Sequence, residues 1–233
     1  MADRPRIAWV TGGSSGIGLA IARALGEAGY GVVISARDEA RLREACATIP
    51  GSAFIVADMT DRPAVQAAAQ TILDRHGRID VLVNNAGFNV RQRSWEDLVP
   101  EEFDAVLAAN LTGAFNAIHA VLPAMRAQRS GHVVSISSVA GKQVSLDGGV
   151  AYTVAKHGVH VLSRLLQQSE QKHGIKVSVI SPGGVSTRAH DWRPQEVRAY
   201  MLAPEDVARA VRFITEAPPN TAIFDIELSW APA

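Results

Sequence analysis

Two patterns of hydrophobic positions alternate along the chain. Short runs rich in β-branched residues, such as Val32-Val33-Ile34, are separated by longer Ala-rich stretches with helical spacing. Runs that are apolar throughout are typical of parallel strands covered on both faces. The predicted strands are Arg6–Thr11, Gly31–Ala36, Ser52–Ala57, Ile79–Asn84, His132–Ser137, Lys176–Ser181 and Ala222–Ser229, and the predicted helices are Ile17–Ala28, Glu39–Thr48, Ala64–Arg75, Phe103–Met125, Tyr152–Lys172 and Pro204–Thr215.

This alternation predicts an α/β fold. Repeated strand–helix–strand units form right-handed crossovers, so we expect a doubly wound (Rossmann) parallel sheet of about seven strands flanked by helices on both faces. No internal repeat or linker divides the 233 residues, and a single domain over 1–233 is expected. A ligand of such a sheet binds beyond the carboxyl ends of the strands.

Composition narrows the function classes. With 23 basic and 23 acidic residues, the chain has no overall field that would attract nucleic acid or an anionic membrane. No apolar run approaches the ~20 residues that span a bilayer, and the N-terminus leads directly into the first strand, without room for a signal peptide. We therefore expect a cytoplasmic protein. The single cysteine, Cys46, and the scattered histidines predict no disulfide and no metal site.

A glycine-rich turn follows the first predicted strand. Its sequence is Thr11-Gly12-Gly13-Ser14-Ser15-Gly16-Ile17-Gly18, and a helix comes next. Glycines allow the backbone to approach a pyrophosphate, and the helix N-terminus offers N–H groups and a positive dipole end. Three residues separate Gly12 from Gly16, which differs from the GxGxxG fingerprint. Taken alone, the turn fits an ordinary strand–helix connection equally well.

Further motifs follow in order, each at a predicted strand end or helix start. They are Asn84-Asn85-Ala86-Gly87, Asn110-Leu111-Thr112-Gly113, Ser138, Tyr152-Thr153-Val154-Ala155-Lys156 and Pro182-Gly183-Gly184-Val185-Ser186-Thr187. With the TGxxxGIG turn, they resemble the NNAG, NxxG, Ser, YxxxK and PGxVxT motifs of the short-chain dehydrogenase/reductase family along the whole chain. The resemblance implies an oxidoreductase that transfers a hydride between a nicotinamide dinucleotide and a carbonyl or alcohol, the cofactor carrying the hydride.

The expected catalytic set centres on Tyr152. Lys156 lies four residues later, on the same helix face, and its ammonium is expected to lower the phenol pKa from about 10. Tyr152 then exchanges a proton with the substrate oxygen. The resemblance gives Lys156 a second role on the nicotinamide ribose, selects Ser138 over its neighbour Ser137 to hold the substrate oxygen, and places Asn110 in a water-borne proton relay.

The resemblance also assigns the dinucleotide contacts. Asp58 would contact the adenine ring, although capping of a turn is an alternative for this residue. Asn84 and Gly87 would line the adenosine side, and Val185 with Thr187 would meet the carboxamide. The full expected set is Gly12, Ser14, Ser15, Gly16, Ile17, Gly18, Arg37, Asp58, Met59, Asn84, Ala86, Gly87, Tyr152, Lys156, Pro182, Gly183, Val185 and Thr187.

The end of the second strand bears on the choice between NADP and NAD. Ala36 stands where NAD-preferring relatives place an acid, and Arg37 resembles the basic residue that NADP-preferring relatives direct at the 2′-phosphate. Against this, Ser15 stands where many NADP-dependent relatives carry another basic residue, and Asp38 would replace the missing acid if the strand were two residues longer. NADP(H) is favoured, and NAD(H) remains open.

The substrate itself is not identified by the sequence. Residues 188–203 form a short expected lid that carries His190, Trp192, Arg193 and Tyr200, and Arg91 and Trp95 could line the opposite wall. Each of these is equally well an ordinary loop residue. A short lid indicates a ketone or aldehyde of modest size, and the chain most resembles NADP-linked carbonyl reductases and 3-hydroxy-acid dehydrogenases.

Other functions remain as alternatives. A catalytically silent dinucleotide sensor would commonly lack the Tyr or Lys that this chain has, and an NAD-preferring alcohol dehydrogenase differs only in cofactor. An epimerase or dehydratase of the extended family needs a substrate lobe for which the chain is too short. The resemblance implies a homodimer or homotetramer formed through the helices of Asn110–Arg126 and Tyr152–Lys172.

Overall fold

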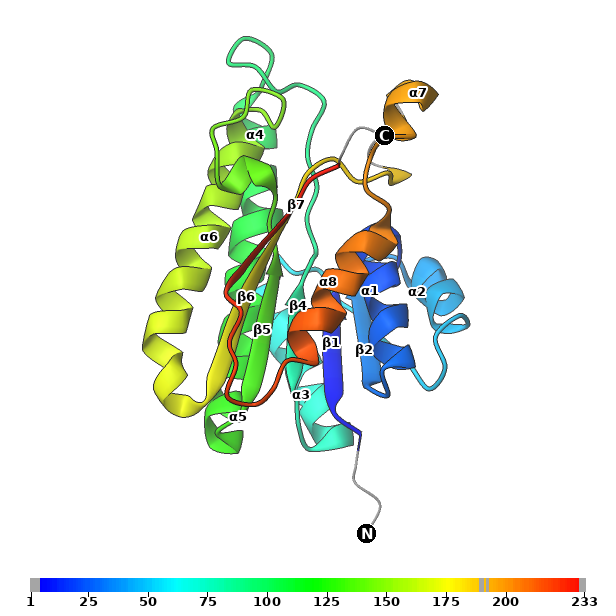
Figure 1. Ribbon diagram of the computed structural model, residues 1–233, viewed down its shortest axis with the longest axis vertical. Helices are drawn as coiled ribbons and strands as arrows, with labels where there is room; N and C mark the ends of the chain where they lie inside the picture. Colours follow the sequence, from blue (N-terminus) through cyan, green and yellow to red (C-terminus); the bar gives the residue numbers. More distant parts are fainter. Residues whose placement is uncertain (1–4, 189–190, 192, 231–233) are drawn as a thin grey trace.

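The computed structural model describes residues 5–188, 191 and 193–230. In this part of the chain seven parallel strands form one sheet in the order β3-β2-β1-β4-β5-β6-β7 (Figure 1). The strands are β1 Ile7–Thr11, β2 Gly31–Ala36, β3 Ala53–Val56, β4 Val81–Asn84, β5 Gly131–Ile136, β6 Ile175–Pro182 and β7 Asp225–Leu228. The strand order reverses between β1 and β4, and in doubly wound sheets ligands bind beyond the carboxyl ends of the strands at such a switch point.

Helices cover both faces of the sheet. They are α1 Gly16–Glu27, α2 Glu39–Cys46, α3 Arg62–His76, α4 Pro100–Leu107, the π-helical η1 Ala108–Thr112, α5 Gly113–Gln128, the short 3₁₀ turn η2 Val139–Gly141, α6 Val150–Glu170, the 3₁₀ turn η3 Gln171–His173, α7 Gln195–Arg198 and α8 Pro204–Thr215. One core lies between the sheet and α1, α2 and α8, and a second lies between the sheet and α3, α5 and α6. The predicted doubly wound α/β fold is confirmed.

Strand β1 shows why these residues fold as a central strand. All five of its side chains are buried. Ala8 and Val10 enter the core under α1, whereas Ile7 and Trp9 enter the opposite core, as expected from the two-residue period of a strand. The indole N–H of Trp9 donates to the Ser35 hydroxyl at 3.0 Å, which satisfies its buried polar group.

The prediction of one helix over Phe103–Met125 is wrong in detail. The segment begins at Pro100, where proline suits the first helical turn, and it contains the π-helical turn η1 between α4 and α5. Asn110 lies in that turn, and π-helical turns occur frequently at functional sites. The last strand is also shorter than predicted, since only Asp225–Leu228 pairs with β6.

Among the described residues, one helical stretch passes a length and hydropathy test for crossing a membrane. Over the most apolar 18 residues of Pro100–Gln128 the mean hydropathy is 1.5, although polar residues interrupt the apolar runs. In this window 44% of the stretch is buried inside the protein, and α5 packs against α3, β4 and β5, as the core helix of a globular fold does.

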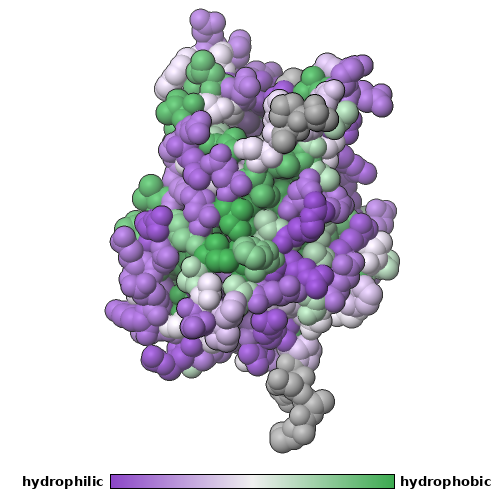
Figure 2. Space-filling view, in the orientation of Figure 1, coloured by the Kyte–Doolittle hydropathy of each residue, from purple (hydrophilic) through white to green (hydrophobic). Residues whose placement is uncertain are grey.

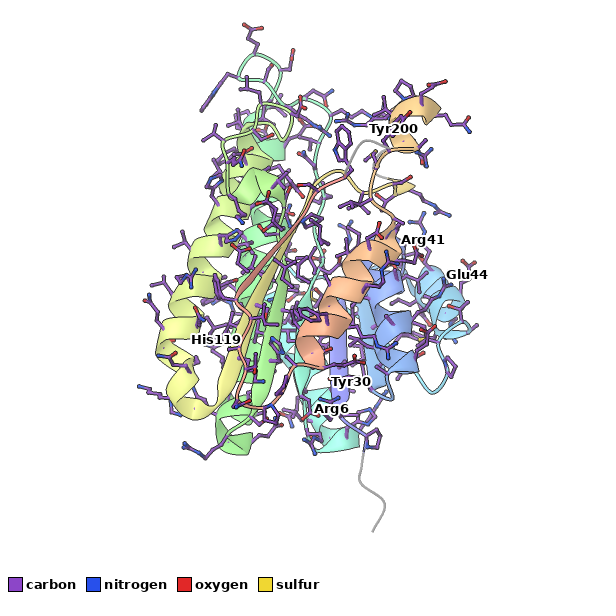
Figure 3. The ribbon with its side chains drawn as sticks, viewed as in Figure 1. Arg6, Tyr30, Arg41, Glu44, His119 and Tyr200 are labelled. Carbon is purple, nitrogen blue, oxygen red and sulfur yellow. The ribbon has the colours of Figure 1, made fainter. Side chains whose placement is uncertain are left out.

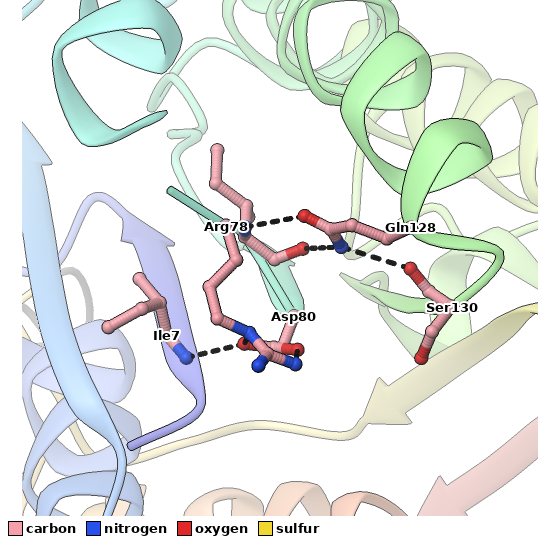
Figure 4. A network of polar contacts seen from close by, with 6 residues as sticks. Ile7, Arg78, Asp80, Gln128 and Ser130 are labelled. Atoms are coloured by element: carbon pink, nitrogen blue, oxygen red, sulfur yellow. Dashed lines mark hydrogen bonds and ion pairs between the residues drawn. The ribbon is translucent and has the colours of Figure 1, made fainter. Parts of the chain in front are cut away.

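The amino edge of the sheet is held by a polar network (Figure 4). Asp80 accepts a hydrogen bond from the Ile7 backbone N–H at 2.7 Å and is paired with Arg78. The Gln128 amide donates to the Ile79 carbonyl and accepts from the Ile79 N–H, at 3.0 and 3.1 Å. These contacts join β1, β4 and the end of α5, at the edge opposite the glycine turn.

Candidate functional site

The glycine turn has a tight backbone that its glycines make possible. Gly12 has a φ of +67°, and a Cβ there would lie 2.9 Å from the Ala86 Cα. A Cβ on Gly18 would overlap the Gly12 carbonyl oxygen. The Gly12 N–H donates to the Ser35 carbonyl at 2.7 Å, so the turn is fixed beside the end of β2.

The turn is locked to the NNAG segment through Thr11 and Asn85. The Thr11 hydroxyl accepts the N–H groups of Asn85 and Ala86, each at 3.1 Å, and donates to the Val83 carbonyl. The Asn85 amide donates to the carbonyls of Thr11 and Gly12. Sequence reasoning named neither residue as a site residue, although their identity within the two motifs was a signal that could have found them.

The PGGVST segment, which follows β6, lies against the same turn. A Cβ on Gly16 would lie 3.4 Å from the Thr187 Cγ2, so the PGGVST segment faces the start of α1. Val185 is buried and forms a parallel bridge with Leu202. The structure thus brings together Gly12, Gly16, Gly18, Ala86 and Thr187 from three separate strand ends.

Tyr152 lies next to Ser138 at the carboxyl end of β5. Tyr152 is the third residue of α6, and its hydroxyl forms a hydrogen bond with Ser138. The Lys156 ammonium donates to the Ile136 carbonyl at 2.9 Å and lies 5.4 Å from the centroid of the Tyr152 ring. Lys156 is buried, with 5% of its surface exposed. The three predicted side chains therefore form one cluster.

The prediction that the pKa of Tyr152 falls below about 10 is wrong in this structure. Burial raises the pKa of Tyr152 to about 12, while the hydrogen bond with Ser138 and the guanidinium charge of Arg93 act in the opposite direction. Burial also lowers the pKa of Lys156 to about 8. The helical spacing correctly places both residues on one face. It carries no information about burial, and the low-dielectric surroundings determine the pKa of both groups.

The two neighbouring serines have different surroundings. The Ser137 hydroxyl is buried and donates to the Lys156 backbone carbonyl at 3.3 Å, whereas Ser138 is the partner of Tyr152. The segment after Ser138 is tied to the edge strand, because the Lys142 ammonium contacts carboxylates of Asp225 and Glu227 at 3.2 and 2.9 Å. Ser138 is thus the serine beside Tyr152, and its catalytic role stays a prediction.

Asn110 is almost fully buried within η1. Its amide N–H groups donate to the carbonyls of Phe88 and Val106 at 2.7 and 2.9 Å, and its side-chain oxygen lies against Gly87. That oxygen has no hydrogen-bond partner. Asn110 therefore fixes the loop after β4 and presents an unused acceptor beside Gly87.

The end of β2 lies beside the end of β3. Arg37 is largely exposed, and its Nη1 lies 3.9 Å from the Asp58 carboxylate. Burial acts to raise the pKa of Asp58, but the two hydrogen bonds from Thr60 and the charge of Arg37 outweigh it and hold that pKa below its usual value. Asp58 also caps its turn in this way, since the Thr60 N–H donates to it at 2.9 Å.

Some expected contacts lie deeper in the fold. Asn84 is buried and donates to the Ala114 carbonyl of α5, and the Met59 side chain is also buried.

His190 and Trp192 lie outside the described residues, so their expected places in the lid remain predictions. In the described part of that segment, α7 carries Arg198, which pairs with Asp191 at 3.0 Å.

Arg93 is a site residue that sequence reasoning missed. Its Nε and Nη1 donate to the carbonyls of Val90 and Asp147 at 2.9 and 2.7 Å, and its charge acts on Tyr152. No motif marks this residue, because its role depends on two loops that meet only in the folded protein. No group of three His, Cys, Asp or Glu side chains suited to a metal occurs in residues 5–188, 191 and 193–230.

The sequence profile of the short chain dehydrogenase family matches residues 6–198. The chain belongs to this family. Similar proteins include an uncharacterised oxidoreductase of Staphylococcus saprophyticus, 33% identical over 229 residues that cover 95% of both chains. L-fucose dehydrogenase of Bos taurus is 35% identical over 182 residues, which cover 78% of this chain and 67% of that protein. The solved structure of a metagenomic short-chain oxidoreductase in complex with NADP has a TM-score of 0.84, 33% identity and 98% coverage of both chains.

This short-chain dehydrogenase is therefore an NAD(P)-dependent oxidoreductase that acts on CH–OH groups. Its glycine turn fits a dinucleotide. The N–H groups of the first turn of α1 have no partner within the helix, no acidic side chain occupies that turn, and Ser15 makes no capping hydrogen bond with them. An anionic pyrophosphate would satisfy these donors.

Proposed function

We propose that this short-chain dehydrogenase reduces a ketone or aldehyde of modest size with NADPH. The observation that carries the proposal is the cluster of Tyr152, Ser138 and Lys156 at the carboxyl end of β5, on the same edge of the sheet as the glycine turn. The test is a panel of carbonyl compounds, alcohols, diols and hydroxy acids, with the absorbance of reduced cofactor as the readout. Turnover of carbonyls with NADPH is expected.

A bound nicotinamide dinucleotide supplies the hydride. Tyr152, whose pKa lies near 12, is protonated at neutral pH and donates its hydroxyl proton to the substrate oxygen during reduction. Ser138 holds that oxygen, since its hydroxyl already bonds to Tyr152. In the reverse direction the same phenol oxygen takes a proton from an alcohol.

Lys156 stabilises the phenolate that forms when Tyr152 gives up its proton. Its ammonium is fixed on the Ile136 carbonyl, near the Tyr152 ring, so its charge acts at short range in a buried site. Asn110 supports the same site with its unused acceptor beside Gly87, where a water could connect to the lysine.

A pH profile tests the role of Lys156. Burial lowers the pKa of Lys156 to about 8, so its positive charge is complete below that pH and is lost as pH rises. We expect kcat/KM for reduction to fall as pH increases through about 8. The Lys156→Arg variant keeps its charge, so in enzyme that still binds NADPH this fall should disappear. A fall that persists at the same pH would assign it to another group.

NADP(H) is the proposed cofactor because of the charge at the end of β2. Arg37 is 76% exposed at its side chain, on the edge of the sheet that carries the glycine turn, and Ala36 offers no carboxylate to a ribose. The NADP complex of the similar metagenomic oxidoreductase supports the same choice. An NAD-preferring enzyme is the alternative, with Asp38 as its nearest acid.

The Arg37→Ala variant separates the two cofactors. We expect its KM for NADPH to rise at least tenfold, because the guanidinium–phosphate contact is lost, and its KM for NADH to change little. Steady-state kinetics with both cofactors measures this. Arg41→Ala is the matched control, since Arg41 is a neighbouring exposed arginine on α2 that pairs with Asp38 (Figure 3). Equal losses with NADPH and NADH would contradict the assignment.

The proposal includes a homodimer or homotetramer that acts in the cytoplasm. Exposed apolar side chains on α5 and α6 support self-association, among them Phe115, Val161 and Leu165. A catalytically silent sensor remains the second candidate function. Binding of NADPH without turnover of any compound in the panel would favour it.

A further inference from the structure

Two loops beside Tyr152 are fastened to each other. The first connects β4 to α4, and the second connects η2 to α6; Figure 1 shows them together at one end of the molecule. The Asn89 amide donates to the Gly148 carbonyl at 2.9 Å, and Arg93 donates to the Asp147 carbonyl at 2.7 Å. The Val150 N–H donates to the Arg93 carbonyl at 3.0 Å. The pair therefore acts as one wall, and we call it the site rim.

The site rim carries the most exposed large hydrophobic side chains in the described part of the chain. Leu146 is 93% exposed, Val144 86% and Trp95 85%. Across the site, Val197 and Tyr200 are also exposed, and Figure 3 shows Tyr200 at the same end of the molecule. At this end Figure 2 shows small hydrophobic patches among hydrophilic ones. Single exposed apolar residues are ordinary, but a group of them beside a reactive centre marks a binding surface.

The site rim is continuous with the catalytic residues. Val144 and Leu146 lie between Ser138 and Tyr152 in sequence, on the one loop that joins the two. Trp95 lies two residues from Arg93, whose guanidinium charge acts on Tyr152. A molecule whose oxygen lies on Tyr152 and Ser138 can extend along this rim, so the substrate itself is the occupant that fits it.

We infer that the substrate carries an apolar group, of several carbon atoms, attached to the carbonyl that Tyr152 protonates. The inference rests on the proposed function and names the substrate class of the same site. An alkyl or aryl group gains free energy by covering Leu146, Val144 and Trp95, whereas a polyhydroxylated chain would lose hydrogen bonds to water there. An apolar ketone or aldehyde is thus the expected class, in preference to a sugar.

A homologous series of ketones tests the inference. With NADPH and methyl ketones from butanone to 2-octanone, we expect kcat/KM to rise about threefold for each added methylene that reaches the rim. Dihydroxyacetone, as the polar comparison, should be a poor substrate. In Leu146→Ser and Trp95→Ala the rise with chain length should flatten. The control Phe213→Ser alters an exposed apolar residue on α8 and should keep the full rise.

The result that overturns the inference is turnover of short ketones with no dependence on chain length. An unchanged rise in both rim variants would also overturn it. If Leu146→Ser changes the oligomeric state in size-exclusion chromatography and Phe213→Ser does not, the rim is an interface between copies of this chain, and the inference fails.

If no carbonyl in the panel is reduced, the proposed function is contradicted, but the inference is not. A binding measurement then tests the inference by itself. Titration with 2-octanol should change the intrinsic tryptophan fluorescence of the protein, and Trp95→Phe should remove most of that change. 1,2,3-Propanetriol at the same concentrations should have no effect. Equal responses to both alcohols, or a full response in Trp95→Phe, would contradict an apolar site at the rim.

Discussion

Tyr152→Phe is expected to lower kcat at least a thousandfold, about the upper range of general acid–base catalysis by one side chain. The variant keeps the partly buried ring and loses only the hydroxyl that meets Ser138 and the substrate oxygen. No other group in the cluster can replace it, because the Lys156 ammonium is held by the Ile136 carbonyl and Ser138 is a weak acid. Steady-state reduction of the best carbonyl in the panel measures the loss.

Two measurements show that the loss is chemical. Binding of NADPH, followed by fluorescence, should be within about twofold of the parent, and the midpoint of urea unfolding should change little, since one hydrogen bond contributes about 1 kcal/mol. Residual turnover above one tenth of the parent rate would mean that the proton comes from another residue. Weakened NADPH binding would mean that Tyr152 serves chiefly to hold the dinucleotide.

Gly18→Ala is expected to have the second large effect. Its added methyl group would overlap the Gly12 carbonyl oxygen and lie 2.5 Å from the Asn85 side-chain nitrogen. Relief requires the backbone of the glycine turn to move away from α1, at a cost of about 2–3 kcal/mol. We expect the midpoint of urea unfolding to fall and the affinity for NADPH to drop at least a hundredfold.

Gly26→Ala is the matched control, because it makes the same change on the same helix. A Cβ at Gly26 would lie 3.1 Å from the Ile49 Cγ2, a side-chain atom that can shift, and alanine favours a helix by about 1 kcal/mol over glycine. We expect this variant to fold and to bind NADPH like the parent. Similar losses in both variants would show that α1 tolerates no added methyl group, and that the turn is not specially constrained.

The sheet could be predicted from sequence because its central strands are buried on both faces and their hydrophobic runs are therefore unbroken. Strand β1 is an example, with Ala8 and Trp9 pointing into different cores and both fully buried. The π-helical turn at Asn110 could not be predicted, since its hydrophobic period differs little from that of the flanking helices. The Asn110 amide in this turn bonds to the Val106 carbonyl one turn earlier and to the Phe88 carbonyl, and the second bond joins segments 22 residues apart.

The candidate site could be predicted where the relative positions of its residues depend only on their spacing within one helix or turn. The spacing of Tyr152 and Lys156 places them on one helix face, and the glycine turn precedes α1 as expected. Their ionisation was not predictable, because burial sets the pKa of Tyr152 and of Lys156. Arg93 was missed for a related reason: its position depends on a contact between loops that are more than fifty residues apart in sequence.

The bonds that fasten the two loops involve main-chain atoms on the side of residues 147–150. Arg93 and Asn89 donate to the carbonyls of Asp147 and Gly148, and Val150 contributes its N–H. The attachment therefore does not depend on which side chains stand at Val144 and Leu146. Mutation at these two positions can change the range of substrates without disturbing the placement of Tyr152. New substrates can therefore be obtained here, by evolution or by directed selection, while the catalytic tyrosine keeps its position.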